Sequence, residues 1–170
     1  MLSESARVTT AAESKFRIDY PNSKPRATKV IALDPPSEAV VKRLAQGKWQ
    51  QASFFTSLKF DGAPRSGEGW SMKAWLSDLA GRTKDLIDEV ASADLVVMVA
   101  SAGTKPKAAS VIAEACSVRK VMTTALVIDS QAKSDDDLSK TLSALRPHAA
   151  MLVIASNDDY IDEMLAALRA

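Results

Sequence analysis

The sequence predicts a three-layer, doubly wound (Rossmann-like) α/β fold with a mainly parallel sheet of about five strands. Short apolar runs without polar alternation recur along the chain, and amphipathic stretches separate them. Such strands are buried on both faces, and helices between them imply parallel pairing with right-handed crossovers. The hydrophobic fraction is 46% and the aromatic fraction only 5%, so small aliphatic side chains are expected to form the core.

A chain of 170 residues is long enough for one domain with its own core. Residues 1–27 are polar and show alternation only around Phe16, Ile18 and Tyr20. We interpret them as an N-terminal arm, which either packs across the domain or a partner or remains a loosely held tail. The single α/β domain is expected over residues 28–170.

The domain is expected to begin with a strand at residues 30–33 (VIAL), which Pro35 and Pro36 follow. Ser37 is a suitable N-cap for the next helix, and Gly47 follows its end. Further apolar runs and amphipathic stretches repeat this pattern. The expected strands cover residues 30–33, 53–58, 95–100, 123–128 and 151–155. The expected helices cover residues 37–46, 75–91, 106–119, 134–145 and 160–168.

Residues 61–69, DGAPRSGEG, are expected to form an irregular loop, either a lid that carries Arg65 and Glu68 or a plain connection. Between residues 75 and 91 the apolar positions recur at steps of three and four, which predicts a helix with one buried face.

Composition narrows the function classes. The net charge of +1 provides no field that would attract nucleic acid or an anionic membrane. One cysteine, Cys116, and one histidine, His148, rule out an internal disulfide and the usual ligand sets of transition metals, so no metal site is expected. Neither a secretion signal nor a membrane-spanning run is recognisable, which favours a cytoplasmic protein.

Ligands of doubly wound sheets bind at the carboxyl ends of the strands. The segment 101–107, SAGTKPK, is the strongest candidate, because Gly103 permits a tight turn and Pro106 suits the first position of a helix. Backbone N–H groups there would face an anion, and hydroxyls and lysines would add to its binding. The candidate ligand-binding residues at this rim are Ser101, Gly103, Thr104, Lys105, Lys107, Asp34, Ser37, Asp129 and Asn157. A solvated turn without a ligand is the competing interpretation.

Beyond periodicity, the order of residues resembles the nucleotide-binding half of the tubulin/FtsZ-type GTPases. Four stretches carry the resemblance: RTKDLIDEVASADLVVMVASAG (82–103), AASVIAEAC (108–116), TTALVI (123–128) and LSALRPHAAMLVIASNDDYI (142–161). It implies a nucleotide as ligand. The glycine-rich phosphate loop of that family is reduced here to SAGTKPKAA, and its first loop to DPPSEAV, whose prolines lack N–H groups. The resemblance therefore implies a nucleotide-binding scaffold without self-contained GTP hydrolysis.

Three functions remain open. The first is a module that binds a nucleotide or another phosphorylated small molecule at residues 101–107. The second is an interaction module that has lost its ligand site and forms a homo-oligomer through the arm or an apolar helix face. The third, ranked last, is a small enzyme whose acid or base is Asp34 or Asp129. No residue is assigned as catalytic.

Overall fold

The computed structural model describes residues 24–57, 75–79, 82–129, 134–156 and 158–170. Its strands are β1 (Thr28–Ala32), β2 (Ala52–Thr56), β3 (Trp75–Asp78), β4 (Thr83–Asp85), β5 (Leu95–Ser101), β6 (Met122–Ile128) and β7 (Met151–Ala155). Its helices are α2 (Pro35–Leu44), α3 (Leu86–Ala91), α4 (Ala109–Arg119), α5 (Asp135–Leu145) and α6 (Asp158–Ala167), with a short 3-10 helix, η2 (Arg146–His148).

All described strands form one sheet in the order β4-β3-β2-β1-β5-β6-β7. Five neighbouring strands are parallel, namely β2, β1, β5, β6 and β7. Strands β3 and β4 extend the sheet beyond β2 in antiparallel pairing. The predicted parallel α/β architecture is thereby confirmed. The chain runs outward from β1 to β2 and then returns to the other side of β1 at β5, so the strand order reverses between β1 and β5.

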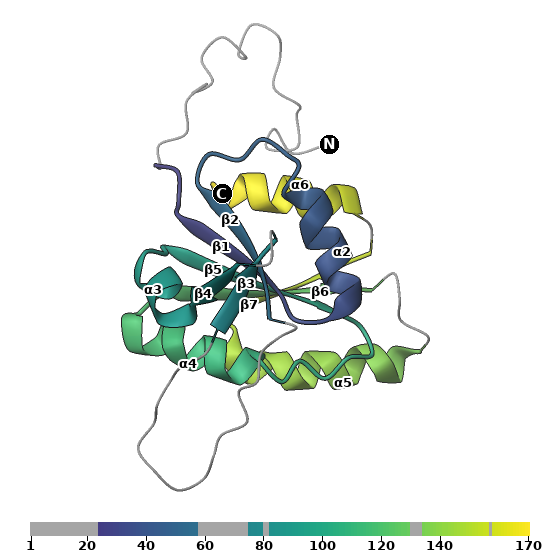
Figure 1. The fold of residues 1–170 in the computed structure, drawn as a ribbon. Helices are drawn as coiled ribbons and strands as arrows, with labels where there is room; N and C mark the ends of the chain where they lie inside the picture. Colours follow the sequence, from purple (N-terminus) through teal and green to yellow (C-terminus); the bar gives the residue numbers. More distant parts are fainter. Residues whose placement is uncertain (1–23, 58–74, 80–81, 130–133, 157) are drawn as a thin grey trace, which may run out of the picture.

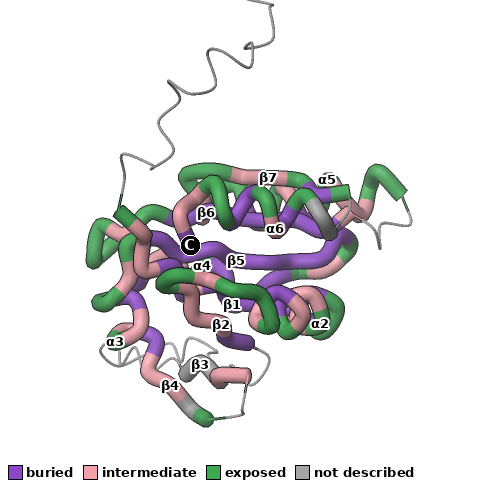
Figure 2. Tube along the Cα trace, turned by 90° about the horizontal axis from the view of Figure 1, so that it is seen from above, coloured by how far each residue is buried: buried purple, intermediate pink, exposed green. Residues whose placement is uncertain are grey.

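Helices cover both faces of the sheet (Figure 1). Residues of α2 and α6 pack with one set of strand side chains, and residues of α3, α4 and α5 pack with the other. The central strand β5 is buried along its whole length, as the purple tube in Figure 2 shows. Its side chains alternate between the layers, with Val97 on the α2/α6 side and Met98 on the other. This accounts for apolar strands that lack polar alternation.

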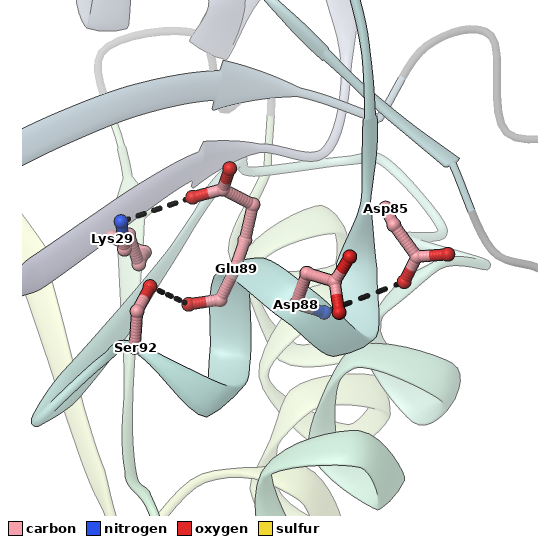
Figure 3. A network of polar contacts seen from close by, with 5 residues as sticks. All are labelled: Lys29, Asp85, Asp88, Glu89 and Ser92. Carbon is pink, nitrogen blue, oxygen red and sulfur yellow. Dashed lines mark hydrogen bonds and ion pairs between the residues drawn. The ribbon is translucent and has the colours of Figure 1, made fainter.

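The predicted helix over residues 75–91 is wrong for its first part, because Trp75–Asp78 forms β3 and Thr83–Asp85 forms β4, and the helix α3 covers only Leu86–Ala91. Asp78 accepts hydrogen bonds from the backbone N–H and the guanidinium of Arg82, at 2.8 and 2.7 Å, between the two strands. The Asp85 carboxylate then accepts from the N–H groups of Ile87 and Asp88, which starts α3, and Figure 3 shows the bond from Asp88. Pairing with β2 and these local bonds outweigh the helical spacing.

A partly buried ion pair fixes α3 to the sheet. The Lys29 ammonium of β1 lies 2.9 Å from the Glu89 carboxylate of α3, and the side chains are 12% and 20% exposed (Figure 3). The same ammonium lies 5.8 Å from the centre of the Phe55 ring. Because a charge with this little exposure needs a partner, the pair orients α3 against β1.

The remaining elements agree with the sequence prediction to within a few residues, except that α4 begins at Ala109 and not at Pro106. Loop 61–69 and residues 1–23 of the expected arm lie outside the described residues, so both interpretations stay predictions. None of the helices that the structure describes has the length and apolar character to cross a membrane.

Candidate functional site

The point where the strand order reverses is occupied by the side chain of Asp34, which follows β1 and is 5% exposed. Its Oδ1 accepts hydrogen bonds from the Ser37 N–H and the Ser101 hydroxyl, each at 2.9 Å. Its Oδ2 accepts from the Ser101 N–H at 2.7 Å and the Thr104 hydroxyl at 3.1 Å. One buried carboxylate thus joins the start of α2, the end of β5 and the turn that follows β5.

Asp34 is the N-cap of α2, so the prediction that Ser37 has this role is wrong. Ser37 occupies the third helical position, where its hydroxyl accepts from the Asp34 N–H at 3.2 Å and lies 2.9 Å from the Asp34 carbonyl oxygen. The result is a reciprocal capping box. Pro35 and Pro36 fill the first helical positions, where a missing N–H costs nothing.

The turn after β5 uses its own N–H groups within the protein. Gly103, at φ 89°, donates to the Thr141 hydroxyl of α5 at 3.0 Å and lies 3.3 Å from the Asp137 carbonyl oxygen. Ala102 donates to the Ile128 carbonyl at 2.9 Å, and Thr104 to the Ser101 carbonyl at 3.3 Å. The Ser101 N–H donates to Asp34, so each N–H group of residues 101–104 has an acceptor within the protein. They hold the turn in place, so the charges available to an anion come from side chains further along.

Those charges belong to Lys105 and Lys107, which are exposed on either side of the buried Pro106. The lysines face a groove of about 410 Å³ between this segment and α5. The groove is lined by Lys105, Pro106, Lys107, Asp136, Ser139, Lys140, Ser143 and Ala144. Its volume lies within the range of small-molecule sites.

The α5 residues that line this groove were not among the predicted ligand-binding residues. Asp136, Ser139, Lys140 and Ser143 occupy positions i, i+3, i+4 and i+7, a spacing that places them on one side of a helix. Lys140 lies 3.9 Å from Asp136, and both side chains are largely exposed. The sequence alone could have shown this spacing. It could not show which loop faces α5 in the folded chain.

The predicted ligand-binding residues therefore fall into separate groups. Asp34, Ser37, Ser101 and Thr104 form one hydrogen-bonded network, while Lys105 and Lys107 line the groove with α5. Asp129 does not line this groove; it is half-buried after β6, and its N–H donates to the Ala155 carbonyl at 2.9 Å. Asn157 lies outside the described residues.

Cys116 and His148 lie apart from this groove. Burial raises the pKa of the Cys116 thiol to about 11, which suits a small hydrophobic residue of the core. The carbonyl of His148 in η2 accepts a hydrogen bond from the Thr123 hydroxyl at 3.1 Å. Within the described ranges, no cluster of three or more His, Cys, Asp or Glu residues is placed to hold a metal ion.

Comparison with known proteins gives weak structural similarity only. No protein-family model matches the chain, and no curated protein matches it. Among solved structures, the apo form of translation elongation factor SelB from Methanococcus maripaludis matches 85% of this chain and 36% of that one, at 10% identity and TM-score 0.44. The same factor in complex with the GTP analogue GppNHp matches 88% of this chain and 34% of that one, at 9% identity and TM-score 0.46. The chain spans about a third of the length of these chains.

Proposed function

We propose that the chain binds a small phosphorylated molecule, such as a nucleotide, in the groove between residues 105–107 and α5. The observation that carries the proposal is the convergence of Lys105, Lys107 and Lys140 on one concavity. In a chain whose net charge is only +1, these cations form a local basic site.

The other polar groups of the groove suit the rest of such a ligand. Ser139 and Ser143 supply hydroxyl donors, and the Asp136 carboxylate is an acceptor for a sugar hydroxyl. The resemblance of residues 82–161 to the nucleotide-binding half of the tubulin/FtsZ-type GTPases is the reason to include nucleotides among the ligands. Because the N–H groups of residues 101–104 have acceptors within the protein, we propose binding without GTP hydrolysis.

Thermal unfolding of the full chain with increasing GTP, ATP, a sugar phosphate or inorganic phosphate tests the proposal. A ligand that binds only the folded state at 100 times its Kd stabilises it by about 2.7 kcal/mol. For a chain of this size, that corresponds to a rise in Tm of roughly 5–10 °C. Sodium chloride at equal ionic strength controls for screening.

Charge reversal locates the site. In the double variant Lys105→Glu with Lys107→Glu, the rise in Tm should disappear, because the groove would carry negative charge. The matched control reverses two exposed lysines that do not line the groove, Lys48→Glu with Lys120→Glu, and should keep the rise. Equal losses in both double variants, or no rise in the unmodified chain with any phosphate compound, would contradict the proposal.

A further inference from the structure

The two edges of the sheet differ in their chemistry. One edge is β4, three residues long with the sequence Thr-Lys-Asp. The other is β7, five residues long with the sequence Met-Leu-Val-Ile-Ala. Proteins usually protect edge strands by shortness, charge or proline. The β4 edge has two of these features, and β7 has none of them.

The β7 edge also exposes apolar side chains. Met151 is 38% exposed and Ile154 is 43% exposed, on opposite faces of the strand. Figure 2 shows intermediate and exposed residues along β7, of which only Ala155 is buried, in contrast to the buried β5. In the described part of the chain, β6 is the only strand that pairs with β7. Among the described residues, no strand covers the other side of β7, which is therefore a surface for pairing with a further strand.

We propose that a second copy of this chain pairs antiparallel with β7, so that the two sheets become continuous across a two-fold axis. With Val153 opposite Val153 of the second copy, Leu152 lies opposite Ile154 and Met151 opposite Ala155. Every opposed pair is apolar, and bulky Met151 meets a small residue. Such pairs stabilise adjacent strands.

Charge complementarity favours this antiparallel arrangement. Arg146 and His148 precede β7, whereas Asp158 and Asp159 begin α6 directly after it. A two-fold axis at Val153 brings the end of each β7 that Arg146 precedes to the end of the other β7 that Asp158 and Asp159 follow. Parallel pairing would bring like charges together. A two-fold contact uses the same surface on both copies, as here.

Sedimentation velocity on the full chain over a concentration series tests the pairing. The unmodified chain should show a species of twice the 18.2 kDa monomer mass. Ile154→Lys should weaken its association at least about tenfold, a change of roughly 1.4 kcal/mol, because a lysine would lie in the contact. Met151→Lys should weaken association to a similar extent. It is an independent test of the same contact in case Ile154→Lys does not fold. Val118→Lys is the matched control, because Val118 is 69% exposed on α4 and does not lie on β7.

Arg146→Glu tests the charge argument and should also weaken association, whereas Lys48→Glu, in the loop after α2, should not. A strictly monomeric unmodified chain would overturn the proposal, as would dimers that persist in both β7 variants. Phe16→Ser with Tyr20→Ser tests the expected arm as the alternative contact. If this change abolishes the dimer and the β7 variants do not, the arm forms the interface and the proposal is wrong.

Discussion

Asp34 and Ser101 are joined by two hydrogen bonds, in which the carboxylate of Asp34 accepts from the backbone N–H of Ser101 at 2.7 Å and from its hydroxyl at 2.9 Å. The two residues lie at the ends of adjacent parallel strands, where doubly wound folds bind their ligands. Here that position contains a buried network that also involves Ser37 and Thr104. The concavity with cationic residues lies beside it, along α5.

Asp34→Ala should lower the free energy of unfolding by about 3 kcal/mol, because it removes a helix cap and leaves buried donors without an acceptor. Asp85→Ala is the matched control. Asp85 caps α3 but accepts only two backbone hydrogen bonds, so its loss should cost about 1 kcal/mol. Urea unfolding monitored by circular dichroism measures both. Equal losses would show that the bonds to Ser101 and Thr104 contribute nothing beyond the cap.

Thr141→Val should detach the turn after β5 from α5. The Thr141 hydroxyl is 3.0 Å from the Gly103 nitrogen and 2.9 Å from the Thr104 carbonyl oxygen, and no part of the residue is exposed. We expect a loss of about 1 kcal/mol, because the Gly103 N–H keeps only its longer contact with the Asp137 carbonyl and the Thr104 carbonyl loses its donor, while side-chain volume is kept. Amide hydrogen exchange should show faster exchange at Gly103.

Thr141→Ser provides the comparison for this prediction, because it keeps the hydroxyl and removes a methyl group. The Gly103 amide should exchange slowly in this variant, as in the unmodified chain. If both variants protect Gly103 equally, the hydroxyl does not hold the turn.

Gly103→Ala should destabilise the fold by about 1–2 kcal/mol, because φ is 89° at this position and side chains with a Cβ atom are strained there. Space is not the cause, since an added Cβ would lie 3.5 Å from the Asp137 Cβ, an ordinary contact. Thermal unfolding measures the effect. An unchanged Tm would mean that the turn relaxes to another conformation without cost.

The Cys116 thiol should make stability fall at alkaline pH. Its pKa is raised to about 11 by burial, from an ordinary value of 9.0. Above pH 9 the thiol of the unfolded chain ionises first. The contribution of this residue to stability is therefore complete below about pH 9 and is lost as the pH rises towards 11, by roughly 3 kcal/mol at most.

Cys116→Ala separates this effect from other groups that ionise at high pH. The variant should be less stable at pH 7, because a packed sulfur is lost, but its stability should decline less between pH 8 and 10. Parallel pH profiles for the two proteins would show that Cys116 does not cause the decline.

The sequence was most informative where burial alone decides the structure. The run Leu95–Ala100 could be recognised as a buried strand because every residue in it is apolar, and the structure buries each of them. Strands β3 and β4 were misassigned because the pairing of β3 with β2 is a long-range interaction that helical spacing does not reveal. A three-residue strand such as β4 carries too little pattern to be recognised at all.

The candidate site was predicted in part. Lys105 and Lys107 were identified from their place after a buried strand, but Lys140 belongs to another helix and only the fold brings it to the same groove. Asp34 was recognised as a rim residue with several possible roles. Its hydrogen bonds to Ser101 and Thr104 could not be foreseen, because they span 67 and 70 positions of the sequence.

The short, charged β4 strand also determines how far an assembly of this protein could grow. If two copies join along β7, each free end of the combined sheet is a β4 strand, whose Lys84 and Asp85 discourage the addition of another chain. Strand pairing between copies would therefore stop at a dimer, and an open-ended filament would not form through the sheet edges.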